Sequence, residues 1–193
     1  MHKQDELQLL FYFTAVYIVV FTLVAYYYSN YEFMLYTLIL GALLFIIVKH
    51  HDEMHLTVPV MLGNSLFGLF HMLGGNLYIN GIRLYDFPLV TGLIRYDQFV
   101  HFFGAFMVVA VSYNLLLPHL DAKVKHHSFL LGLLLVLIAG GIGVFNELLE
   151  LLAVIVLHVG PQVGDYLNNT LDLLYNTLGS VVASIFVISY HRK

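Results

Sequence analysis

The chain contains no cysteine, and only 10% of its 193 residues are charged. The first absence excludes disulfides and catalytic or metal-binding thiolates. Soluble domains are about 25% charged, so the second absence excludes an ordinary soluble domain. The eight lysines and arginines form no basic stripe, and the net charge is −4. Nucleic acid is therefore not an expected partner. The G-x-S-x-G motif of serine hydrolases is also absent.

Apolar residues make up 60% of the chain, and its mean hydropathy is +0.85. A helix needs about 20 apolar residues to cross the bilayer core. Six segments meet this requirement: 8–28, 32–48, 57–74, 98–117, 129–157 and 170–190. The sequence therefore predicts an all-α protein, a polytopic membrane helix bundle of six transmembrane helices that forms a single membrane domain over residues 1–193. Because segment 57–74 contains Pro59 and several glycines, a re-entrant third segment is the alternative.

The distribution of basic residues predicts the orientation. Six of them fall on one side of the six-span arrangement: Lys3, Lys49, Lys123, Lys125, Arg192 and Lys193. Only Arg83 and Arg95 fall on the other side. Basic residues favour the cytoplasmic side, so both termini are expected in the cytoplasm of a multi-pass cell-membrane protein. The first segment lacks a small-x-small cleavage site and is expected to be a retained span.

The outer side has one sizeable connection, residues 75–96. Within it the stretch YINGIRLYDFP contains Asn80 followed by Gly81. This pair favours a two-residue turn between antiparallel strands, which predicts a short hairpin.

Ionisable residues gather in the outer halves of the spans. Asp97 and His101 are four residues apart and share one helix face. Glu147 and Glu150 lie three residues apart in the apolar stretch GVFNELLELL. His71 and Asp172 come from two other spans, and Asp165 lies in the outer loop that precedes Asp172. Ionisable residues inside spans usually face a bundle interior and mark a functional site.

A structural interpretation of these residues stays open. Protonated carboxyl groups can hold neighbouring membrane helices together through hydrogen bonds. The small residues of the last two segments are expected to let helices pack closely: Gly140, Gly141, Gly143, Gly179 and Ala183.

Three stretches resemble a family of membrane proteins: YDQFVHFFGAF, GVFNELLELL and VGDYLNNTLDLLYNTLGS. With FHMLGGNLY, they resemble the YjdF-like group of uncharacterised membrane proteins, and more distantly the VanZ-like proteins. The resemblance covers about residues 64–184. It implies the fold and a polar site but no established reaction. Distant VanZ-like proteins commonly have glutamine where Glu150 stands, so Glu147 is the stronger candidate.

Two mechanisms fit this set of side chains. In the first, His71, Asp97, His101, Glu147, Asp165 and Asp172 bind a divalent metal such as zinc, magnesium or manganese. In the second, His101 is a general base oriented by Asp97, Glu147 is the acid, and Asp172 completes the catalytic set.

Either mechanism suits hydrolysis or transfer on a lipid or lipid-linked headgroup, and membrane lipid is an expected partner in any case. A proton- or cation-coupled transporter and a non-catalytic binding or scaffold protein are the alternatives.

Overall fold

The structure is a computed structural model that describes residues 3–157 and 166–191. Six of its helices are long and apolar enough to cross a membrane, which confirms the predicted polytopic helical fold. The chain divides into two compact units, Met1–Asp97 and Gln98–Lys193. Each unit is described below by itself.

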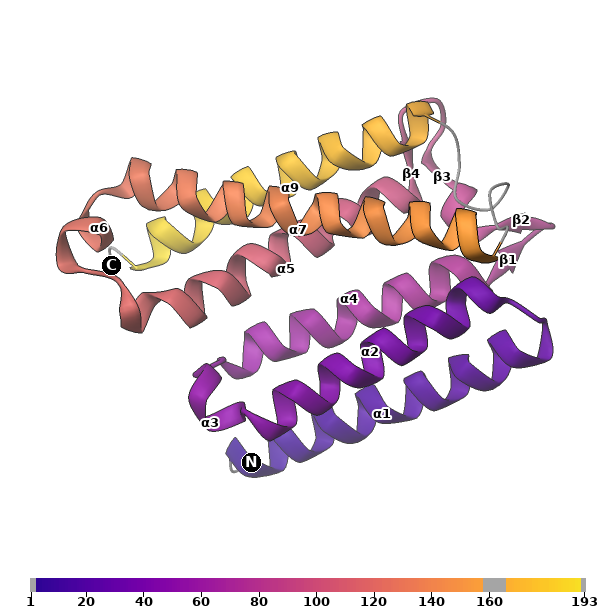
Figure 1. Ribbon diagram of the computed structural model, residues 1–193, viewed down its shortest axis with the longest axis horizontal. Helices are drawn as coiled ribbons and strands as arrows, with labels where there is room; N and C mark the ends of the chain where they lie inside the picture. Colours follow the sequence, from indigo (N-terminus) through magenta and orange to yellow (C-terminus); the bar gives the residue numbers. More distant parts are fainter. Residues whose placement is uncertain (1–2, 158–165, 192–193) are drawn as a thin grey trace. The chain divides into compact units, whose positions relative to one another are not determined.

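The first unit is built on three long helices that lie side by side, α1 (Lys3–Tyr27), α2 (Tyr31–Lys49) and α4 (Val58–Asn76) (Figure 1). The short helix α3 (His51–Met54) follows α2. A polar contact joins α1 to α4, because Thr14 Oγ1 lies 2.6 Å from Ser65 Oγ and the Tyr17 hydroxyl donates to the Ser65 carbonyl at 3.0 Å. Buried hydroxyls thus find partners across the helix interface, as an apolar surrounding requires.

Helix α4 settles how the third apolar segment folds. Pro59 lies in its first turn, where no intrahelical N–H bond is lost. The helix continues without interruption for 19 residues, a length of about 28 Å, which is close to the thickness of the bilayer core. The glycines serve packing instead: a Cβ on Gly75 would meet the ring of Phe33. The third segment is therefore a full-length helix.

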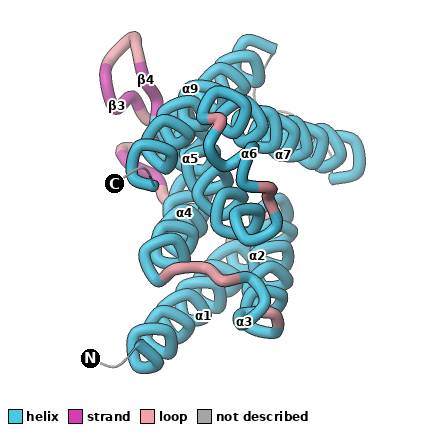
Figure 2. The backbone as a smooth tube through the Cα atoms, turned by 90° about the vertical axis from the view of Figure 1, so that its left-hand side faces the viewer, coloured by secondary structure: helices cyan, strands magenta, loops and turns pink. Residues whose placement is uncertain are grey.

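Two small hairpins connect α4 to the next helix (Figure 2). Strands β1 (Tyr78–Ile79) and β2 (Ile82–Arg83) pair antiparallel, and Asn80 and Gly81 form the expected turn with positive φ angles of 52° and 79°. After the 3-10 turn η1 (Leu84–Asp86), strands β3 (Pro88–Val90) and β4 (Ile94–Arg95) form a second hairpin that the sequence did not predict.

The second unit contains three long helices, α5 (Tyr96–Leu116), α7 (Ser128–Leu157) and α9 (Tyr166–His191). The short elements η2 (Leu117–His119) and α6 (Ala122–His126) connect α5 to α7. Helices α7 and α9 pack against each other and cross in the view of Figure 1. The first turn of α5 contains the boundary between the two units, so Asp97 is part of the helix that continues into the second unit.

The core of the second unit lies toward one end of the bundle. Its buried members come from the second half of α5, the first half of α7 and the second half of α9: Val109, Tyr113, Leu131, Leu135, Ala139 and Ala183. At the opposite end α5 begins, α7 ends and α9 begins. This second region is the polar end, because it contains Asp97, His101, Glu147, Glu150 and Asp172.

The glycines of this unit divide into two kinds. A Cβ on Gly179 would collide with the backbone carbonyl of Phe102, and one on Gly143 would lie 3.0 Å from the Asn176 side chain. These two positions are tightly packed, as the sequence predicts. Gly140 and Gly141 are different, since no atom lies within 4 Å of a Cβ built on either. The close packing expected at Gly140 and Gly141 is therefore wrong.

This difference can be tested with glycine substitutions. Gly179→Leu forces α9 away from the rigid backbone of α5, and overpacking of this kind typically costs about 1–3 kcal/mol. Gly140→Leu is the matched control and should not lower stability, because the Cβ of residue 140 meets no neighbour in the described residues and leucine favours a helix more than glycine does. Thermal unfolding of the detergent-solubilised protein measures both. Equal melting temperatures for the two variants would contradict the packing described.

Candidate metal centre

The polar end of the second unit brings ionisable side chains from three helices together. Helix α5 provides Asp97 and His101, which lie one turn apart on the same face. Helix α9 provides Asp172, which is only 1% exposed. Helix α7 provides Glu147 and Glu150, and both carboxylate oxygens of Glu147 are buried. Four carboxyl groups thus gather near one imidazole.

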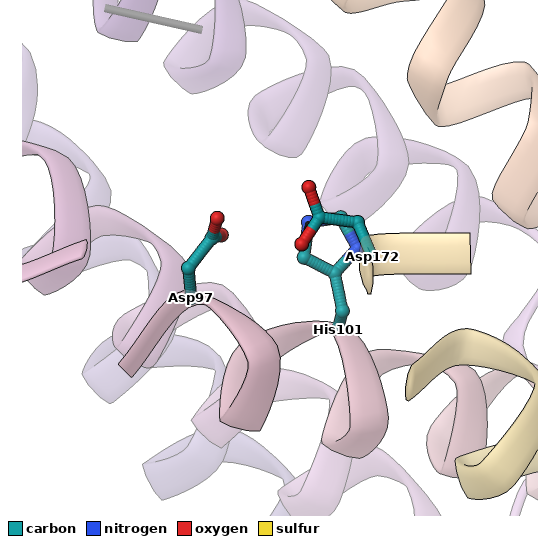
Figure 3. A group of neighbouring side chains, drawn as sticks. All are labelled: Asp97, His101 and Asp172. Atoms are coloured by element: carbon teal, nitrogen blue, oxygen red, sulfur yellow. Dashed lines mark ion pairs between the residues drawn. The ribbon is translucent and has the colours of Figure 1, made fainter. Parts of the chain in front are cut away.

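The first group consists of Asp97, His101 and Asp172 (Figure 3). One ligating atom from each lies within 4.8 Å of those of the other two. In this group His101 Nε2 lies 3.8 Å from Asp172 Oδ1. Figure 3 shows Asp97 and His101 on successive turns of α5, with the Asp172 carboxylate beside the imidazole ring.

The second group consists of His101, Glu147 and Glu150, whose ligating atoms also lie within 4.8 Å of one another. His101 therefore belongs to both groups. Glu150 was the weaker candidate in the sequence, but its ligating atom lies within the same distance of the other two as that of Glu147. The imidazole is the common centre of the five side chains.

Two asparagines orient the carboxylates, and sequence reasoning missed both. Asn168 Nδ2 donates to Asp172 Oδ2 at 2.8 Å, and Asn146 Nδ2 donates to Glu150 Oε1 at 2.8 Å. In each pair the asparagine precedes the acid by four residues, so the two side chains lie on one helix face. This spacing of four residues is the feature of the sequence from which both asparagines could have been found. Hydrogen bonds of this kind fix the orientation of metal-ligating carboxylates.

The side chains fit a divalent cation by chemistry and by spacing. Imidazole nitrogen and carboxylate oxygen are ligands for zinc, manganese and, through oxygen, magnesium. Two ligands at about 2.0–2.2 Å from such an ion lie no more than about 4.4 Å apart. The ligating atoms of each group lie within 4.8 Å of one another, so small side-chain rotations are enough to bring them into this range.

Two further residues were predicted to bind metal, His71 and Asp165. His71 is part of the first unit, where its Nδ1 is hydrogen-bonded to the Tyr85 hydroxyl. The rings of Phe33 and Tyr36 pack against its imidazole. Neither ligand group in the described part of the chain includes His71. Asp165 lies outside the described residues.

Six membrane-length helices and a polar centre among the helices of the second unit define a polytopic helical membrane protein. Residues 8–193 match the family described as "Predicted membrane protein (DUF2238)", and the chain belongs to that family. The match includes the first two spans, which carry no motif of the resemblance. No curated protein and no solved structure matches the chain. The family's description names neither the YjdF-like nor the VanZ-like group, so both remain predictions.

The contact between His101 and Asp172 predicts an energetic coupling. In a double-mutant cycle of His101→Ala and Asp172→Asn, residues in contact typically show an interaction energy of about 0.5–3 kcal/mol. A cycle of His101→Ala with Tyr190→Phe, near the other end of α9, is the control and gives additive effects. Denaturation of the purified protein measures both cycles. Additivity in the first cycle would show that the two side chains do not interact.

Proposed function

We propose that the second unit binds a divalent cation at His101 and uses it for hydrolysis or transfer on a lipid or lipid-linked headgroup. The main support for this proposal is that His101 belongs to both groups of possible metal ligands. These groups lie on helices that are long and apolar enough to cross a membrane. Several ionised carboxylates this close together, away from bulk water, are strongly unfavourable without a compensating positive charge. A divalent cation provides that charge.

The residues have distinct parts in this proposal. His101, Asp97 and Asp172 would hold the ion, with Asn168 fixing the Asp172 carboxylate. A bound ion supplies Lewis-acid activation of water or of a phosphoryl oxygen. Glu147 and Glu150 lie on the opposite helix beside the same imidazole. They are the groups placed to accept a proton from an attacking water and to return it to the leaving group.

The depth of the centre supports a lipid substrate. His101 and Asp172 lie five and six residues from the first residues of α5 and α9, and Glu150 and Glu147 lie seven and ten residues before the last residue of α7. At the helical rise these separations are about 7–15 Å. Such a depth corresponds to the region just below the bilayer surface, where lipid headgroups join their chains. The charge bias of the loops supports placing the polar end outward in the cell membrane.

Transport of protons or cations is the second candidate, because the five side chains form a series of titratable groups in one region. The remainder of the bundle argues against a complete path. Between Phe129 and Asn146, helix α7 has no histidine, acid or base, and α9 has none between Asp172 and His191. The series of titratable groups therefore ends inside the bundle, which favours a binding site over a transport path.

Elemental analysis of the purified protein tests the proposal. The wild type should carry about one divalent ion per chain, as expected for a preformed ligand set. His101→Ala and Asp172→Asn should lose the ion, whereas His119→Ala, which changes an exposed histidine of η2, should retain it.

Two results would contradict the metal centre. One is a wild type free of metal after purification and after incubation with zinc, magnesium or manganese salts. The other is an equal metal content in all variants. Proton or cation flux in liposomes, abolished by Glu147→Gln, would favour transport instead.

A further inference from the structure

A groove lies between α7 and α9 in the second unit. Its volume is about 330 Å³, at the lower end of the range of small-ligand sites. Helix α7 lines it with Val136, Leu137, Gly140, Gly141 and Val144. Helix α9 lines it with Leu173, Asn176 and Thr177.

The groove exists because two adjacent residues of α7 have no side chain. No atom lies within 4 Å of a Cβ built on Gly140 or Gly141, so the described part of the chain leaves this space open. Leu137, Val144 and Leu173 have exposed side chains at its rim. The result is a narrow, mostly apolar depression on the side of the second unit that α7 and α9 form.

The groove is lined from the same faces of α7 and α9 as those that carry Glu147 and Asp172. Gly140, Val144 and Glu147 follow one another at spacings of four and three, so they lie on one face of α7. On α9, Asn176 follows Asp172 by four residues and shares its face. The groove and the carboxylates therefore occupy the same seam between the two helices. The groove lies deeper in the bundle, and the carboxylates lie toward the polar end.

Asn176 provides a polar point in this apolar wall. Its side chain is 7% exposed, and no acceptor in the described residues lies within hydrogen-bond distance of its buried Nδ2. Burying an amide donor without an acceptor costs free energy. Asn176 lies one turn, or about 6 Å, deeper than Asp172. In a glycerolipid, the ester carbonyls lie just beneath the headgroup and accept hydrogen bonds.

We propose that the groove binds one acyl chain of a glycerolipid. In the complex, the Asn176 side chain turns its amide from Gly143 into the groove and donates to the ester carbonyl, and the headgroup lies at Asp172 and His101. The position of the headgroup rests on the proposed function, whereas the acyl-chain site stands on the groove alone. The substrate of the second unit is then an ester-linked glycerolipid.

The spacing of the small residues favours an acyl chain over a second helix. Close helix pairs in membranes use small residues four positions apart, which let two backbones approach along a ridge. Here the residues four positions before and after Gly140 are Val136 and Val144, and those around Gly141 are Leu137 and Phe145. A helix backbone is held off by these side chains, whereas a flexible hydrocarbon chain fits between them.

Photolabelling of the full-length protein tests the acyl-chain site. The protein is reconstituted in vesicles of phosphatidylethanolamine and phosphatidylglycerol that contain a phosphatidylglycerol with a diazirine in the middle of one acyl chain. The label at Leu173 and Thr177 is then measured by peptide mass spectrometry. The groove-filling double variant Gly140→Leu/Gly141→Leu should reduce this label several-fold. Gly41→Leu should not, although Gly41 in α2 also has no atom within 4 Å of its Cβ position.

A second comparison needs no change to the groove glycines. In the wild type, the ester-linked probe should label Leu173 and Thr177 more than an ether-linked analogue, which lacks the carbonyl. Asn176→Leu has a similar volume and no donor, and should abolish the difference between the probes. Equal labelling of the wild type, the folded groove variant and Gly41→Leu would overturn the acyl-chain site. Equal labelling of the wild type by the ester and ether probes would overturn the role of Asn176.

Asp172→Asn separates this inference from the proposed function. It should lose the metal ion while the groove remains labelled, because Asp172 does not line the groove. A wild type that binds no metal but is labelled in the groove would refute the metal centre and support the acyl-chain site. A wild type that binds metal but shows no label in the groove would support the metal centre and refute the acyl-chain site.

Discussion

The interaction on which the polar end depends is the one between the His101 imidazole and the carboxylates around it. Hydrocarbon cannot solvate an ion, so acidic groups at this depth need a positive charge or a proton. A single histidine lies within reach of four carboxyl groups. A divalent cation is one way to provide that charge, and the two groups of possible ligands that share the His101 ring favour it.

The packing of the second unit is arranged so that these groups can meet. Gly179 brings the backbone of α9 against Phe102, the neighbour of His101, and Gly143 leaves room for Asn176. The apolar core then closes the opposite end of the bundle. Asn146 and Asn168 hold two of the carboxylates in fixed orientations. Where glycines meet no neighbour, at Gly140 and Gly141, the same seam opens into a groove suited to a lipid chain.

The sequence predicted the helices because long apolar runs are a strong signal, and it grouped Asp97, His101, Glu147 and Asp172 because their depths along separate spans coincide. The depth of a residue along its span does not show which helix faces pack against each other. His71 shares the depth but packs among aromatic rings in the first unit. Gly140 and Gly143 look alike in sequence, yet only Gly143 meets a side chain. Glu150, Asn146 and Asn168 were identified from side-chain contacts in the structure. Their spacing in the sequence is compatible with these contacts but does not show that they form.

The central claim is that His101 coordinates a divalent ion together with carboxylate oxygens. X-ray absorption spectroscopy at the edge of the ion bound to the purified protein tests it most directly. The account predicts a first shell of nitrogen and oxygen with the outer-shell signature of one imidazole, and loss of that signature in His101→Ala. A bound ion with no imidazole signal, or a spectrum unchanged by His101→Ala, would contradict the account.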